Sequence, residues 1–153
     1  MAGFWTNVAI WLPISASLLV QAYKFFWEWY QVGEFDFQVL HRSGGMPSSH
    51  TAMITSLATT VGWIEGVSST IFAFSVVISL IVIYDARGVR QESGKQARVL
   101  NQLVREFFRG EPIGEIKLKE LVGHTPNQVL VGGIFGVSYT LLCLFFLNVA
   151  PHA

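Results

Sequence analysis

Four apolar segments limit what this chain can fold into. They cover about residues 4–23, 50–66, 68–84 and 126–149 of a 153-residue chain in which 52% of residues are hydrophobic and 13% are charged. A bilayer core requires about 20 apolar residues of helix, and the first segment has this length without a charged residue. We therefore expect a single all-α integral membrane domain of about four transmembrane or core helices. A secretory signal peptide is a weaker alternative for the first segment, because no Lys or Arg precedes it.

The second apolar segment differs from the others in its polar content. It is only moderately apolar and, at about 1.5 Å of rise per residue, too short to span a bilayer with lipid on all sides. We expect a core helix whose hydroxyl groups face other helices, because the segment carries four threonines: Thr51, Thr55, Thr59 and Thr60.

The last apolar segment has a well-marked start. Thr125 as N-cap, Pro126 at the first helical position and Gln128 in a capping box predict a helix beginning there. Gly132 and Gly136 form a GxxxG pair. Such a pair permits close approach of a helix from the same chain or from another copy, and we weigh both alternatives.

Two stretches between the apolar segments carry the charge. Residues 24–49 mix aromatic and charged side chains, which is typical of the lipid headgroup level. Residues 85–125 are polar, with one apolar stripe at helical spacing. This stripe predicts an interfacial amphipathic helix and consists of Val99, Leu100, Leu103, Val104, Phe107 and Phe108.

All ten Lys and Arg residues fall on one side of the expected four-segment topology: Lys24, Arg42, Arg87, Arg90, Lys95, Arg98, Arg105, Arg109, Lys117 and Lys119. By the positive-inside rule this side is cytoplasmic or its organellar equivalent, so both termini are expected on the opposite side. The formal net charge is zero, so no nucleic-acid partner is expected. The single cysteine, Cys143, excludes an internal disulfide framework and a Cys-based zinc site.

The same topology brings three stretches to the charged face: Ser43–His50, Asp85–Arg90 and Gly123-His124. The first, SGGMPSSH, is rich in turn residues and opens a helix, where backbone N–H groups and the helix dipole favour an anion. His50 and His124 each stand at the start of a helix, with several cations on the same face. A nucleophile, an acid and cationic groups are what phosphoryl transfer needs.

The motifs resemble those of the type-2 phosphatidic acid phosphatase superfamily, which includes vanadium haloperoxidases. Pro47-Ser48-Ser49-His50 is similar to its PSGH signature, and His124–Gly132 is similar to the end of its third motif. The strings SGGMPSSH, YDARGVR and KLKELVGHTP resemble the small divergent bacterial and plastid branch more closely. The resemblance covers roughly residues 21–136 and implies a bacterial inner membrane or a plastid or thylakoid-type membrane.

The resemblance also implies roles for individual residues. His124 is the expected nucleophile and His50 the expected general acid, with no cofactor and no metal. We expect Asp85 to orient the imidazole of His124, with an ion pair to a nearby cation as an equal alternative. The expected phosphate-binding set contains Ser48, Ser49, Gly45, Lys24, Arg42, Arg87, Arg90 and Lys119.

The chain departs from the superfamily pattern at three places. The first motif, KxxxxxxRP, is absent, since Lys24 and Arg42 are too far apart. Lys117 and Leu118 stand where the superfamily has Ser-Arg before its third histidine. Gln128 stands where it has the aspartate that orients this histidine.

Two functions are compatible with these residues. The first is a membrane phosphomonoesterase for a lipid phosphate of the cytoplasmic leaflet, such as phosphatidylglycerol phosphate or phosphatidic acid. The second is a non-catalytic anionic-lipid-binding or membrane-complex assembly subunit that keeps the fold. Membrane lipids are the expected partners, together with a second copy or another membrane protein through the Gly132/Gly136 face. A channel is disfavoured, because no charge lies within the segments away from the helix ends.

Overall fold

The computed structural model describes residues 3–35, 45–87, 94, 96–103 and 125–152. Within these ranges the chain forms helices and turns and no strand, which confirms the predicted all-α fold class. Residues 96–103 are helical, within the predicted amphipathic segment. The named elements are the 3₁₀ helix η1 (Phe4–Thr6) and the helices α1 (Val8–Val32), α2 (Ser49–Glu65), α3 (Thr70–Arg87) and α5 (Pro126–Phe146). Of these, α1 and α5 are long and apolar enough to cross a membrane.

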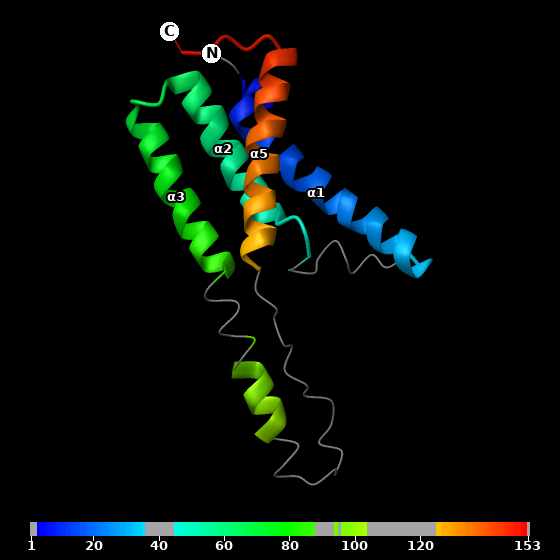
Figure 1. Cartoon of the computed structure of the whole chain (residues 1–153). Helices are drawn as coiled ribbons and strands as arrows, with labels where there is room; N and C mark the ends of the chain where they lie inside the picture. The colour runs from blue at the N-terminus through cyan, green and yellow to red at the C-terminus, as the bar shows by residue number, and fades with distance from the viewer. Residues whose placement is uncertain (1–2, 36–44, 88–93, 95, 104–124, 153) are drawn as a thin grey trace.

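Helix α2 lies at the centre of the arrangement and packs against α1, α3 and α5 (Figure 1). The two chain termini and the α2–α3 turn lie at one end of the bundle. The starts of α2 and α5 and the end of α3 lie at the other end, so successive helices run in alternating directions (Figure 1). Helix α1 crosses the bundle obliquely and diverges from α5 toward its own C-terminus. Sequence stretches that are far apart therefore meet at one end.

Helix α1 is longer than predicted. It starts after Asn7, whose side chain accepts a hydrogen bond from the Ala9 N–H at 3.0 Å, and it continues to Val32 instead of ending near residue 23. Residues 24–32 contain no glycine or proline, so nothing in the backbone stops the helix there. The helix ends where Gly33 adopts a left-handed conformation (φ 79°) and donates its N–H to the Trp29 carbonyl at 2.8 Å.

The other helices start and end within three residues of the predicted segments. Helix α3 follows a turn in which the Ser69 hydroxyl accepts from the Phe72 N–H at 3.1 Å, and it continues to Arg87. The polar loop predicted from residue 85 therefore begins later, and Asp85 lies on the last turn of α3. Helix α5 begins at Pro126 with the predicted capping box formed by Thr125 and Gln128.

The α2 hydroxyl groups face other helices, as predicted for a core helix. Thr51, Ser56 and Thr60 are buried, and the Ser56 hydroxyl lies 2.6 Å from the Thr140 hydroxyl of α5. On the α3 side, the Ser79 hydroxyl donates to the Ile54 carbonyl at 3.3 Å. These hydrogen bonds join α2 to α5 and to α3.

The glycine pair of α5 packs against α2 within the chain. A Cβ added to Gly132 would lie 2.6 Å from the Ser48 carbonyl oxygen, and one added to Gly136 would overlap the Ala52 carbonyl and the Thr55 hydroxyl. Of the two alternatives for GxxxG, the structure therefore shows the intramolecular one. Association with another copy stays a prediction, and it would need a face other than these glycines.

Candidate functional site

The candidate site begins at the turn that leads into α2, which we call the entry turn (residues 45–48). Gly45 has a left-handed conformation (φ 77°), which favours glycine. Ser48 is the N-cap of α2, and its Oγ accepts from the Thr51 N–H at 3.3 Å and from the Thr51 hydroxyl at 3.0 Å. The Ser48 N–H in turn donates to the Gln128 carbonyl of α5 at 3.1 Å. The starts of α2 and α5 are therefore tied together through the main chain.

The three polar side chains at this helix start differ in exposure. Ser48 is 0% exposed and Ser49 is 5% exposed, whereas His50 is exposed in the first turn of α2. The capping contacts of Ser48 use its oxygen as an acceptor, so a phosphate contact would have to use its hydroxyl hydrogen. Burial and helix capping are enough to explain a serine at position 48, and this explanation requires no bound ligand. Direct phosphate binding by Ser48 and Ser49 stays a prediction.

Lys24 of α1 reaches the entry turn from a different part of the chain. It is 9% exposed, and its Cδ and Cε lie 3.7 and 3.9 Å from where a Cβ on Gly45 would be. It is the last of the buried residues along α1, which also include Leu12, Ala16 and Val20. A lysine is rarely this buried unless its ammonium is paired or hydrogen-bonded, since the loss of hydration is costly. Lys24 is therefore the predicted phosphate ligand for which the structure gives the clearest placement.

The start of α5 and the end of α3 complete this end of the bundle (Figure 1). The Gln128 side-chain oxygen accepts from the Thr125 N–H at 3.0 Å, so Gln128 caps its own helix where the superfamily has the orienting aspartate. Asp85 is exposed on the last turn of α3. Ile83 of α3 lines a cavity of about 470 Å³ together with Val129 and Leu130 of α5, so these two helix ends are neighbours.

Several predicted site residues lie outside the described residues. They are His124, which directly precedes Thr125 in the sequence, together with Arg42, Arg90, Lys119 and the side chain of Arg87. The predicted contact between Asp85 and His124 is therefore untested. Among the residues that the structure does describe, no three His, Cys, Asp or Glu side chains are grouped closely enough to hold a metal ion.

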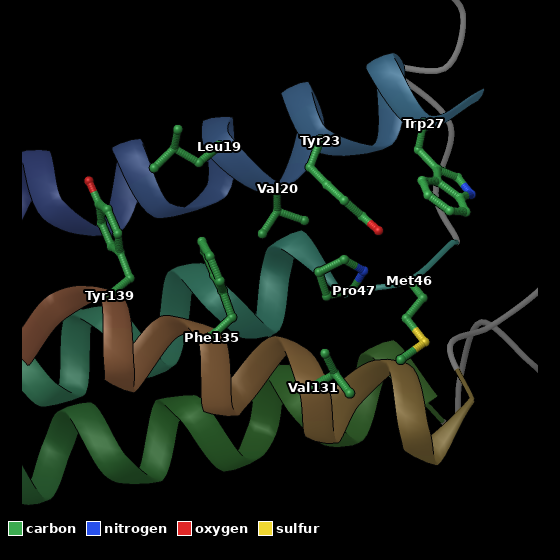
Figure 2. A pocket seen from close by; sticks show the side chains of 9 residues that line it. All are labelled: Leu19, Val20, Tyr23, Trp27, Met46, Pro47, Val131, Phe135 and Tyr139. Atoms are coloured by element: carbon green, nitrogen blue, oxygen red, sulfur yellow. The ribbon is translucent and has the colours of Figure 1, made fainter. Parts of the chain in front are cut away.

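A cavity that was not predicted from the sequence lies next to the entry turn. It has a volume of about 720 Å³ and lies between α1 and α5, with Met46 and Pro47 of the entry turn contributing to its wall (Figure 2). The remaining lining residues fall on helical stripes of α1 and α5, most of them four residues apart. The α1 stripe contains Leu19, Tyr23 and Trp27 and the α5 stripe contains Val131, Phe135 and Tyr139. These spacings were visible in the sequence, but the angle between the two helices was not.

Comparison with known proteins gives the family of this chain. The model of the divergent PAP2 family matches residues 5–139, which include the entry turn, Lys24 and the capping box of α5. The chain belongs to the divergent PAP2 family. This confirms the resemblance found in its motifs. No solved structure matches the chain.

This member of the divergent PAP2 family is similar to the uncharacterized membrane protein YuiD of Bacillus subtilis. The two are 36% identical over 152 residues, covering 92% of this chain and 96% of YuiD. This chain has two helices long enough to span a bilayer. Together with the similarity to YuiD, these helices indicate a membrane protein.

Proposed function

We propose that this protein is a membrane phosphomonoesterase that hydrolyses a lipid phosphate. The observation that carries the proposal is the buried Lys24 of α1, whose stem lies beside Gly45 in the turn that leads into α2, in a chain of the divergent PAP2 family. An α-helix leaves its first N–H groups without partners inside the helix, and its dipole is positive at that end. An ammonium beside such a helix start favours an anionic phosphate.

The positive groups would act on the oxygens of the phosphoryl group. Phosphoryl transfer spreads negative charge over the three equatorial oxygens, and fixed positive groups lower the barrier by stabilising this charge. Lys24 and the first amides of α2 come from two helices that pack against each other. Their relative position is therefore set by the fold before the substrate binds.

The reaction would proceed in two steps through His124. In the first, a ring nitrogen of His124 attacks phosphorus, an N–P bond forms, and the P–O bond to the lipid alcohol breaks. His50 gives a proton to the leaving oxygen. In the second, water attacks phosphorus and gives a proton to His50, and the N–P bond breaks to release inorganic phosphate. The exposure of His50 in the first turn of α2 supports this role, because the group must exchange a proton.

The substrate would be a phosphomonoester lipid of the cytoplasmic leaflet. All ten Lys and Arg residues lie in the two stretches assigned to that side by the positive-inside rule. Phosphatidic acid and phosphatidylglycerol phosphate both present a terminal phosphate at this level. We propose that the membrane is a bacterial inner membrane or a plastid-type membrane, with both termini on the face opposite the site.

The test is phosphate release by purified protein in lipid nanodiscs. We expect hydrolysis of dioleoyl phosphatidic acid without added metal, inhibition by vanadate, and loss of activity in His124→Ala. His152→Ala is the matched control, because His152 lies against Gly66 near the far end of α2. Full activity of His124→Ala would contradict the assignment of the nucleophile.

A non-catalytic lipid-binding or assembly subunit is the second candidate. It is favoured by the complete burial of Ser48 in a capping role and by the use of Gln128 in a capping box. Both residues have structural tasks at positions where the superfamily uses ligand-binding or orienting groups. Binding of phosphatidic acid to nanodisc-embedded protein, with no phosphate release under any condition, would favour this candidate over the enzyme.

A further inference from the structure

The cavity between α1 and α5, which we call the α1/α5 groove, is an apolar wedge with one closed end. At that end the Tyr139 hydroxyl of α5 lies 2.8 Å from the Ser15 hydroxyl of α1, which holds the two helices together. From there α1 diverges from α5, and the space between them widens toward Trp27 and Met46 (Figures 1 and 2). The walls are almost entirely aliphatic and aromatic. Inside a membrane, such a wedge has to be filled by something apolar.

The open end of the groove adjoins the candidate phosphate site. Met46 and Pro47 line the groove, and in the chain they lie directly between Gly45, beside which the stem of Lys24 lies, and the N-cap Ser48. On α1, the groove-lining stripe and the buried stripe that ends in Lys24 run side by side. A molecule with a phosphate at Lys24 would therefore have its apolar part at the mouth of the groove.

The side chains at the mouth suit the level where headgroup and chains meet. Tyr23 and Trp27 stack with their ring centroids 6.1 Å apart, and both are about half exposed. Tyrosine and tryptophan are enriched at this level of a bilayer because one part of each ring system is apolar and another part forms hydrogen bonds. The groove thus begins at an interfacial aromatic pair and continues into apolar surface.

We propose that the α1/α5 groove binds one acyl chain of the phospholipid whose phosphate sits at the entry turn. The inference rests on the proposed function for the identity of the headgroup. The volume of about 720 Å³ falls in the range of ligand sites. From Leu19 to Trp27 the groove follows α1 for about 12 Å at 1.5 Å per residue. One leaflet of a bilayer core is about 15 Å thick, so the groove can accommodate most of the length of an acyl chain in one leaflet.

A transmembrane helix fits the groove less well. A helix about 10 Å wide fills about 420 Å³ per turn, so the groove would hold fewer than two turns. A membrane-spanning helix needs about 20 residues, which is more than five turns. A flexible acyl chain can follow the groove along its length of about 12 Å, so we assign the groove to lipid and not to a second copy of this chain.

The kinetic test compares a lipid with a chainless substrate. Val131→Trp fills the groove from α5, and Leu19→Trp fills it from α1 as a second variant. Ile134→Trp is the matched control, since Ile134 lies on the same helix but lines the other cavity, on the α3 side. We expect both groove variants to lower kcat/KM for dioleoyl phosphatidic acid by about tenfold or more. Hydrolysis of p-nitrophenyl phosphate should be unchanged in all three.

A binding test keeps the inference separate from the enzymatic proposal. Phosphatidic acid with a diazirine in one acyl chain is placed in phosphatidylcholine nanodiscs with the wild-type protein and irradiated. We expect labels on residues 19–27 and 131–139 that excess dioleoyl phosphatidic acid removes and that Val131→Trp abolishes. If the wild-type protein hydrolyses neither substrate, the proposed function fails. The labelling still shows whether the groove binds an acyl chain.

Three results would overturn the assignment. One is labelling spread evenly over lipid-facing residues of α3 and α5 without competition. Another is a loss of lipid hydrolysis in Ile134→Trp while Val131→Trp and Leu19→Trp behave like wild type. The third is a covalent dimer between copies through groove residues, which would assign the groove to a protein helix. Equal retention volume and helix content of all variants confirms that they fold.

Discussion

The contact between α2 and α5 at Gly136 provides a sharp test of the packing. In Gly136→Ala the added Cβ overlaps the Ala52 carbonyl, which belongs to the backbone and cannot rotate away. The helices must separate, at an overpacking cost of about 1–3 kcal/mol. Separation also weakens the bond between the Ser56 and Thr140 hydroxyls (2.6 Å), which is worth about 1 kcal/mol in a membrane. The higher helix propensity of alanine offsets up to about 1 kcal/mol of this loss in stability.

The net expectation for Gly136→Ala is a loss of about 2 kcal/mol in the free energy of unfolding, from these overpacking, hydrogen-bond and propensity effects. The measurement is reversible unfolding in mixed micelles at increasing SDS fraction, followed by tryptophan fluorescence. Gly133→Ala is the matched control on the same helix. Its Cβ would meet only the Thr51 and Thr55 methyl groups at 3.7 Å, which is ordinary contact. Gly133→Ala should therefore be as stable as the wild type or more stable.

The result that would refute this reasoning is a Gly136→Ala variant as stable as the wild type. It would mean that α5 shifts along α2 at little cost, so that the tight approach at Gly132 and Gly136 is not required for folding. A loss in Gly133→Ala as large as that in Gly136→Ala would also contradict the reasoning, because only the methyl group added at Gly136 meets backbone.

Two further predictions concern the two ends of the bundle. Lys24→Met keeps the apolar stem against Gly45 but removes the charge, and we expect kcat for phosphatidic acid to fall by about 10²-fold with the helix content unchanged. Lys24→Arg should recover part of this loss, and full activity of Lys24→Met would remove Lys24 from the site. At the other end, Trp63→Phe deletes the hydrogen bond from the indole N–H to the Val149 carbonyl at 2.9 Å. Amide hydrogen exchange at His152, whose N–H donates to the Trp63 carbonyl at 2.8 Å, should then become faster, and an unchanged rate would show that the tail is held by other contacts.

The start of α5 and the inward-facing hydroxyls of α2 could be predicted because their signals are local. A capping box needs only Thr125, Pro126 and Gln128, and hydroxyls in a membrane helix have little alternative to facing another helix. The end of α1 was placed wrongly because hydropathy reports the surroundings of a residue and not its hydrogen bonding. Charged and aromatic residues mark a change of environment at Lys24, but the helical hydrogen bonds continue to Gly33.

The α1/α5 groove could not be predicted because it depends on a crossing angle. Its stripes, such as Val131 and Phe135, look like any lipid-facing surface in the sequence. They become the walls of a cavity only because α1 contacts α5 near Ser15 and then diverges from it. Lys24 is a similar case. In the sequence it stands in an interfacial stretch, and its burial depends on how the turn at Gly45 lies beside α1.

The hydrogen bond between the Ser48 N–H and the Gln128 carbonyl is built entirely from main-chain atoms. Substitutions can change the side chains at both positions and leave this bond in place. The spacing between the first turns of α2 and α5 therefore does not depend on which side chains stand there. Proline at position 48 is the one replacement that deletes the donor itself. Distant relatives can therefore differ in the motif residues around these two helix starts and still keep the two helices in the same register.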